Sequence, residues 1–315
     1  MLRLILLIML SFNAFGCDRG LDPVPFVPGP HDIEFYGGAG DRGITDNTPA
    51  LNAAVAAGED HLCFGKGHYW FKTKPAPIGY AQGQGVLLEG VTVAHTSLVK
   101  AYNAVDKYDV MLDFQSNGVN GGGAINMGIG AAAGYVNGTL IRVYSPLGSP
   151  ASYMKFENLN FTYDTGGNYD RAVFLDCNAA NTAAQGCRSI KFNNITMFQP
   201  TGKSWVFDIQ NGVSTVVSNA YVFGNMRISG ANTTTTTSTN VLFSGVVGGN
   251  LTVDSSVGVV ATGSFDSITL GATAARVNIF GITNALIANY GASGSFTGDA
   301  SSVTNGSSAS FKLRN

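Results

Sequence analysis

The apolar positions of this chain fall in short runs separated by glycine or asparagine, a pattern typical of β-strands rather than of helices. In the second half such runs come in pairs, and the second members begin at Asn225, Asn250, Ser267 and Ala285, with the last two intervals at 17 and 18 residues. In the first half, Phe156, Phe174 and Phe192 recur at intervals of eighteen residues. We interpret this as a repeat with two strands in each unit.

The stretch from residue 35 to 73 has a different organisation. A glycine-rich turn at 37–41 is followed by helix-capping residues at 45–48 and by Pro49, which suits the first turn of a helix. We predict a short alanine-rich helix over 50–57, with Leu51 and Val55 as its apolar stripe, and then strands at 62–64 and 69–71. This stretch predicts a small helical lid followed by strands.

This order of elements resembles the opening module of the pectate-lyase-like superfamily, which includes phage tailspikes and rhamnogalacturonase- and epimerase-like proteins. Two residues depart from the pattern: Arg42 separates Asp41 from Gly43, and Lys66 stands where the family usually has proline. The resemblance implies a right-handed parallel β-helix closed at one end by this module, and it does not specify a reaction. The matching residues are Phe35, Tyr36, Gly37, Gly40, Asp41, Gly43, Thr45, Asp46, Thr48, Ala53, Ala54, Ala57, Gly58, Phe64, Gly67 and Tyr69.

The fold class that we predict is therefore all-β: a single-stranded right-handed parallel β-helix, or β-solenoid, with a short N-terminal capping helix. In a solenoid each residue stacks over its counterpart one turn away, so inward apolar residues form a continuous column. Asn158, Asn194 and Asn250 suit ladders at the corners, because asparagine tolerates left-handed backbone geometry. The alternative is an antiparallel β-sandwich, which also has short, evenly spaced strands.

The predicted domain organisation has five parts. Residues 1–16 resemble a secretory signal peptide, with an apolar run too short to span a bilayer. Residues 17–32 are a Pro-rich linker. The capping module follows at 33–80, the main parallel β-helix at 81–228, and a charge-poor C-terminal section rich in Gly, Ser and Thr at 229–315.

Composition narrows the classes of partner. Only 12% of the residues are charged, the formal net charge is −2, and no basic patch with interleaved aromatic residues is present. Nucleic acid is therefore excluded as an expected partner. The histidines, His31, His61, His68 and His95, show no metal-ligand spacing, so we expect neither a metal nor a cofactor.

The four cysteines have separate interpretations. Cys17 follows the predicted signal peptide and is a candidate for lipidation, which would be the only membrane attachment. Cys177 and Cys187 flank a loop and are expected to form a disulfide in an oxidising compartment, the alternative being two free thiols. Cys63 is expected to be a small core residue.

Cleavage of a polysaccharide by hydrolysis needs two carboxylates across the scissile bond, whereas elimination needs a base. The candidate catalytic residues are Asp164, Asp170, Asp176 and Asp208, with Asp176 and Asp208 expected to face one groove; the alternative is that these aspartates cap turns. The candidate substrate-binding residues are Tyr163, Tyr169, Arg171 and Trp205; the alternative is that the aromatic residues are packed into the surface.

Two functions from different classes stay open at this point. One is an exported or virion-borne β-helix that binds a polysaccharide along its side and cleaves it as a lyase or a glycoside hydrolase. The other is a non-catalytic tail-fibre or surface adhesin that uses the same rod for binding. The resemblance to tailspikes implies a homotrimer, and the expected location is extracellular, in the cell envelope or on a virion.

Overall fold

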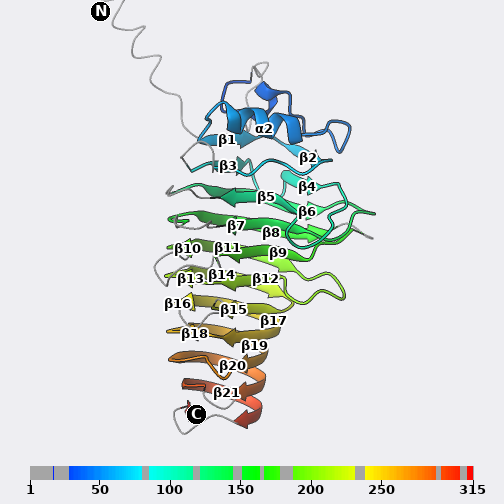
Figure 1. Cartoon of the computed structure of the whole chain (residues 1–315). Helices are drawn as coiled ribbons and strands as arrows, with labels where there is room; N and C mark the ends of the chain where they lie inside the picture. Colours follow the sequence, from blue (N-terminus) through cyan, green and yellow to red (C-terminus); the bar gives the residue numbers. More distant parts are fainter. Residues whose placement is uncertain are drawn as a thin grey trace, which may run out of the picture.

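The computed structural model describes residues 17, 28–79, 85–115, 121–144, 151–163, 167–177, 187–230, 238–288, 292–305 and 311–314. Figure 1 shows the strands piled one above another into a rod, with the N-terminal helices at one end. Each pairing between these strands is parallel. The predicted fold class, an all-β right-handed parallel β-helix with a short N-terminal capping helix, is confirmed.

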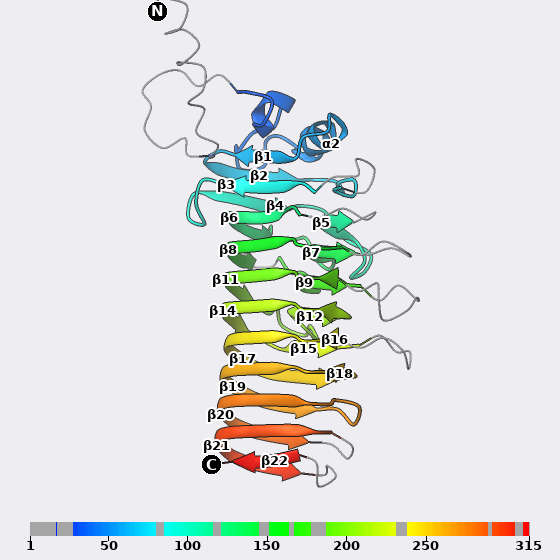
Figure 2. The same ribbon diagram turned by 90° about the vertical axis from the view of Figure 1, so that its left-hand side faces the viewer.

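Each winding, or coil, of the first two thirds of the rod contributes to three stacks of strands, which Figure 2 shows along the rod. The strands that run across the corner between the first and second stacks are β6 (Gly123–Ala131), β8 (Lys155–Tyr163), β11 (Lys191–Phe198) and β14 (Val216–Phe223). Nearer the N-terminus the first stack has β1 (His61–Phe64) and β3 (Leu87–Gly90), and the second has β2 (Gly67–Phe71) and β4 (Thr96–Lys100).

The third stack forms another side of the rod. It consists of β5 (Val110–Gln115), β7 (Thr139–Tyr144), β9 (Arg171–Asp176), β12 (Phe207–Gln210) and β15 (Met226–Ser229). A small separate stack is formed by β10 (Cys187–Arg188), β13 (Gly212–Val213), β16 (Ser238–Thr239) and β18 (Ser256–Val257).

Long bent strands build the C-terminal part of the rod. They are β17 (Leu242–Asp254), β19 (Val260–Leu270), β20 (Val277–Ala288), β21 (Gly294–Asn305) and the shorter β22 (Phe311–Arg314). Asn250, Ser267 and Ala285 occupy the same position in successive coils, as the repeat in the sequence predicts.

The interval of eighteen residues in the first half has another origin than predicted. Phe156 and Phe192 are in register in successive coils, and their rings stack at 4.9 Å. Phe174 lies in β9, in another stack, where it is in register with Asp208. One coil here spans 36 residues, the separation of the stacked Asn158 and Asn194. The spacing of eighteen is therefore half a coil in this section, whereas it is a whole coil near the C-terminus, where Asp266 and Asn284 stack.

The corner between the first two stacks changes residue type along the rod. The residues at this corner are Asn126, Asn158 and Asn194, with positive φ angles of 52–60°. The side-chain amide of Asn158 donates to the side-chain oxygen of Asn126 (2.8 Å), and that of Asn194 donates to the side-chain oxygen of Asn158 (2.9 Å). This confirms the predicted ladder for Asn158 and Asn194. Asn250 lies at a different corner, where its backbone N–H donates to the side chain of Asn225 (2.9 Å). Further along, glycines replace the asparagines at the first corner.

The N-terminal end of the rod is closed by the helix α2 (Thr48–Ala56) and the 3-10 helix η1 (Ile33–Tyr36) (Figure 1). Leu51 and Val55 are buried beneath α2, as the apolar stripe predicts. Asn47, fully buried before the helix, accepts the N–H of Ala39 (2.7 Å) and donates to the carbonyl of Trp70 (3.2 Å). Burial of the stripe and this buried amide fix the lid on the first coils.

Candidate functional site

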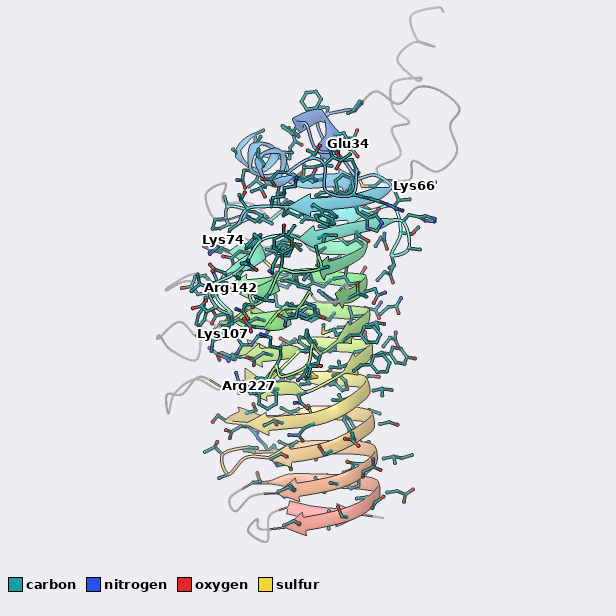
Figure 3. The ribbon with its side chains drawn as sticks, turned by 90° about the vertical axis from the view of Figure 1, so that its right-hand side faces the viewer. Glu34, Lys66, Lys74, Lys107, Arg142 and Arg227 are labelled. Carbon is teal, nitrogen blue, oxygen red and sulfur yellow. A yellow bond between two sulfur atoms is a disulfide. The ribbon has the colours of Figure 1, made fainter. Side chains whose placement is uncertain are left out.

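The connections from the second stack to the third project from one side of the rod. Segments 101–109, 132–138 and 199–206 join β4 to β5, β6 to β7 and β11 to β12. Figure 3 shows Lys107, Arg142 and Arg227 on this side. Because the coils are parallel and in register, these connections lie one above another. Side chains far apart in the sequence therefore meet here.

A pocket of about 540 Å³ lies between these connections. Asp106 and Lys107 line it from one connection, and Lys203 and Trp205 from another. Two strand residues, Arg171 of β9 and Arg227 of β15, and the turn residue Asp170 complete its charged lining. The described lining thus holds four cationic side chains and two carboxylates around one tryptophan.

Polar contacts hold the walls of this pocket together. Lys203 Nζ donates to Asp170 Oδ1 (2.8 Å) and to the side-chain oxygen of Asn137 (2.9 Å). The other oxygen of Asp170 accepts the backbone N–H of Gly138 (2.8 Å). Both oxygens of Asp170 therefore accept hydrogen bonds that join one wall of the pocket to the next.

Lys100 lies beneath the walls and is fully buried. Its Nζ donates to the carbonyl of Tyr102 (2.6 Å) and to that of Val136 (3.3 Å), so it joins two of the connections. Burial lowers the pKa of Lys100 to about 8, although the nearby carboxylates of Asp170 and Asp109 oppose this effect.

The lowered pKa of Lys100 predicts that the stability of the protein depends on pH. Its folded-state pKa of about 8 lies below the ordinary value of 10.5, so between these values the unfolded chain binds more protons and stability rises with pH. Relative to a Lys100→Met variant, wild-type protein should gain about 3 kcal/mol of unfolding free energy over that interval. Urea unfolding of both proteins at several pH values tests this; parallel curves would contradict it.

A network of buried charges lies on the outer face of the third stack. Asp208 is fully buried: its two oxygens accept hydrogen bonds from Arg227 at 2.8 Å and 2.7 Å, and it forms an ion pair with Arg171, whose Nη2 lies 2.9 Å from Oδ2. Gln210 adds a further donor at 3.1 Å. Asp208 therefore positions two arginines of the pocket, and because it is fully buried a substrate cannot reach it.

Arg171 has an open donor. It is only 6% exposed, and among the described residues no acceptor contacts its Nη1. Burial lowers its pKa, although the charge of Asp208 opposes this. Nη1 is itself buried, so Arg171 contributes its charge from behind the pocket lining, whereas the partly exposed guanidinium of Arg227 is open to a ligand.

Asp176 and Asp208 lie on the same outward face in successive coils. Gln210 is in register with Asp176, and Asp208 lies two residues before Gln210, so its side chain points to the same side of the sheet. Burial raises the pKa of Asp176, and the charges of Arg142 and Arg171 only partly offset this effect. Arg142 lies 3.4 Å from Asp176 and forms a shorter bidentate pair with Asp113, at 2.8 Å and 2.7 Å. Neither Asp176 nor Asp208 lines the pocket.

The other predicted site residues divide as follows. Trp205 and Arg171 line the pocket, whereas Tyr169 is buried, with its hydroxyl donating to the carbonyl of Phe198. Asp164 and the side chain of Tyr163 lie outside the described residues. Sequence reasoning missed three cations that the structure brings together: Lys107, Lys203 and Arg227. The alternation of apolar and polar residues in β15 predicts that Arg227 points outward. Which residue of the coil before it lies beside Arg227 can be predicted only if the number of residues in each coil is known.

Trp205 also borders a second hollow. A pocket of about 280 Å³ continues toward the C-terminus and is lined by Trp205 and Arg227 together with Gln210, Thr252 and Asp254. Arg227 lies over the Trp205 ring, with its guanidinium carbon 5.3 Å from the ring centroid. The two pockets therefore share an aromatic and a cationic residue; we call them together the Trp205 groove.

Two disulfides are present in the described part of the chain. Cys177 is joined to Cys187, the pairing expected from the sequence, and Cys17 is joined to Cys63. The second pairing was not foreseen, and it disagrees with a lipid anchor, because a sulfur engaged in a disulfide has no valence for a thioether. The described metal-ligand group, Cys17, His61 and Cys63, contains the same two cysteines.

Mass analysis of the protein from its native source tests the Cys17–Cys63 pairing. Without reductant, alkylation should modify no cysteine, and digestion should yield a peptide that contains Cys17 linked to one that contains Cys63. A lipid mass on Cys17, or alkylation of Cys63 before reduction, would contradict the pairing.

The outcome for the signal peptide stays open, because residues 1–16 lie outside the described part. In the part of the chain that the structure describes, no helix combines the length and the apolar character needed to cross a bilayer.

The similarity of this chain to known proteins is found among solved structures. No protein-family model and no curated protein matches this chain. The catalytic unit of the GH87 α-1,3-glucanase of Streptomyces thermodiastaticus matches with a TM-score of 0.45 and 14% identity, over 94% of this chain and 70% of that chain. The A-module of the mannuronan C-5 epimerase AlgE4 of Azotobacter vinelandii matches at 0.40 and 13%, over 90% and 97%. The surface adhesin PfbA of Streptococcus pneumoniae matches at 0.40 and 9%, over 87% and 91%.

These matched structures are right-handed parallel β-helix proteins, the fold class that the strand pairing of this chain also has. At these identities the likeness concerns the fold alone, so function has to be argued from the groove itself.

Proposed function

We propose that this protein binds an anionic polysaccharide along the Trp205 groove. The observation that carries the proposal is Arg227, whose partly exposed side chain (25%) lies over the Trp205 ring and lines both pockets of the groove. A carboxylate or sulfate group of a ligand would pair with this guanidinium beside the ring.

The rest of the groove suits the same ligand. Trp205 lies where two pockets join, and a tryptophan offers a large, rigid apolar face to a sugar ring. Lys107 and Lys203 add positive charge on the walls. A chain of sugar rings with repeated acidic groups could cross both pockets in one direction along the rod.

Binding is better supported than hydrolysis. Of the carboxylates that line the larger pocket, Asp170 has both oxygens in hydrogen bonds, whereas Asp106 is exposed and accepts the backbone N–H of Tyr108 (2.7 Å) with one oxygen. Hydrolysis needs two carboxylates across the scissile bond, and the described lining of this pocket holds only one with an open oxygen. The charge network on the strands behind the pocket positions arginines.

The direct test is to measure the binding of a panel of polysaccharides to the intact protein, with anionic and neutral chains compared at two salt concentrations. Anionic chains should bind, and more weakly at high salt because exposed charges are screened. Reducing ends and the absorbance of unsaturated sugars should stay at background. Binding of neutral chains only, or of none, would contradict the proposal, and new chain ends would move the assignment to a hydrolase or lyase.

Replacing Trp205 by alanine should weaken the binding of whichever anionic chain the panel identifies about tenfold to a hundredfold, since the ring loses its stacking surface. Titration calorimetry measures the change. Tyr221→Ala is the matched control: Tyr221 is a half-exposed aromatic residue that lines neither pocket of the groove. Equal affinities for the two variants would contradict a role for Trp205.

The proposal includes location and assembly. The two disulfides support an oxidising destination outside the cytosol, as the predicted signal peptide implies. Phe280 and Ile282, at 43% and 58% exposure on the charge-poor C-terminal coils, support self-association, with the homotrimer as the expected form. Light scattering of the purified protein distinguishes a trimer from a monomer.

A further inference from the structure

A separate pocket of about 420 Å³ lies on the second stack, near the lid. Arg42, His68 and Trp70 line it at the end nearer the lid, and Ser97, Val99, Gly130 and Thr162 are among its residues on the strands below. None of its residues lines the Trp205 groove. The pocket therefore belongs to a different face of the rod.

The register of the strands explains the hollow. Trp70, Val99, Gly130 and Thr162 occupy the same outward position in four successive coils. Gly130 has no side chain, so the surface is open between Val99 and Thr162. A Cβ atom at position 130 would lie 2.7 Å from the carbonyl oxygen of Thr162, so only glycine fits there.

Trp70 is held as a fixed wall of this pocket. Gly43 packs against one side of its indole, where a Cβ atom would lie 2.6 Å and 2.7 Å from two ring atoms. The carbonyl of Trp70 accepts the backbone N–H of Asn47 (2.8 Å). The side chain is half-buried and lines the pocket, so part of a rigid aromatic surface is accessible.

Arg42 supplies the charge. Its side chain is exposed, and among the described residues it forms no ion pair with a carboxylate. It has a positive φ of 58°, a conformation that costs energy for a residue other than glycine and that recurs at ligand sites. No acidic side chain is present in the described lining, so nothing there repels an anionic ligand.

We propose that this pocket binds one pyranose ring that bears a carboxylate. The ring would pack on Trp70, the carboxylate would pair with Arg42, and the hydroxyls of Ser97 and Thr162 would exchange hydrogen bonds with those of the sugar. The site is independent of the groove, because it shares no residue with it. This proposal can therefore be tested independently of the proposed function of the groove.

The test uses the full chain with Trp205 replaced by phenylalanine. Trp70 is then the only tryptophan, since the sequence has two. Its fluorescence is titrated with the methyl glycosides of glucuronic, galacturonic and mannuronic acid and with neutral methyl glucoside. At least one uronide should change the emission with a Kd of about 1 mM, as expected of a single small ring, and bind at least tenfold more tightly than the glucoside.

Arg42→Asn in the same background is the decisive variant. Asparagine tolerates a positive φ, so the backbone can keep its geometry while the guanidinium is lost. Uronide affinity should fall at least tenfold to the level of the glucoside, with an unchanged unfolding midpoint. Should the variant unfold, Ser97→Ile, which fills the hollow from the strand, is expected to abolish binding instead. No response to any uronide, equal binding of uronide and glucoside, or unchanged uronide binding after both substitutions would overturn the proposal.

Discussion

Replacing Gly263 by alanine is expected to destabilise the C-terminal coils by about 4 kcal/mol or more, among the largest effects of a single substitution. Gly263 has a positive φ of 145° at the corner of β19, and a Cβ atom there would lie 1.7 Å from the carbonyl oxygen of Gly245 in the coil before it. Neither side of this contact can move, because both are backbone of paired strands. The free energy of unfolding in urea measures the loss.

Two matched variants separate the causes of this effect. Gly134→Ala adds a Cβ at a residue that also has a positive φ, 80°, but has nothing within 4 Å of the new atom, so about 1–2 kcal/mol is expected. Ser264→Ala, an exposed neighbour in the same strand, should change stability by less than about 0.5 kcal/mol. A Gly263→Ala variant no less stable than Gly134→Ala would show that the coils do not stack as closely as described.

The second large effect is expected from Asp208→Asn. The substitution keeps the volume of the side chain but removes the charge that compensates Arg171 and Arg227, and Arg171 is almost fully buried. Breaking a buried ion pair on one side costs about 3–5 kcal/mol. Polysaccharide affinity should fall as well, since both arginines line the groove.

An exposed ion pair provides the control for Asp208. Glu157 lies 3.9 Å from Lys155 on the surface of β8, and Glu157→Gln should change the unfolding free energy by less than about 1 kcal/mol. If Asp208→Asn behaves like this control in denaturant titrations, the buried charge network is not formed, and the arginines are positioned in some other way.

The fold could be predicted because two signals in the sequence are local. The opening module is contiguous in the sequence. Near the C-terminus the connections between strands are short, so equivalent residues of successive coils, such as Asn278 and Ser295, lie only 17 or 18 residues apart. In the first half, the connections that build the pocket also make the coils unequal, with spacings of 32 and 36 residues. For this reason the interval of eighteen residues does not bring Phe174 into the stack that contains Phe156 and Phe192.

The site could be predicted only in part, for the same reason. Three of the predicted site residues lie next to strands that can be recognised from the sequence by their alternating apolar residues. The structure places these three, Asp170, Arg171 and Trp205, in the lining of one pocket. Lys107 and Lys203 come from connections of unequal length, so no spacing in the sequence relates them. The Cys17–Cys63 disulfide joins cysteines 46 residues apart and depends on how the segment before the lid packs.

The most direct test is a crystal structure of the protein with the shortest anionic oligosaccharide that the panel shows to bind. We expect a sugar ring packed on Trp205 and an acidic group of the ligand within hydrogen-bonding distance of the guanidinium of Arg227. An oligosaccharide that is well ordered elsewhere on the rod, with Trp205 and Arg227 free of ligand, would contradict this account.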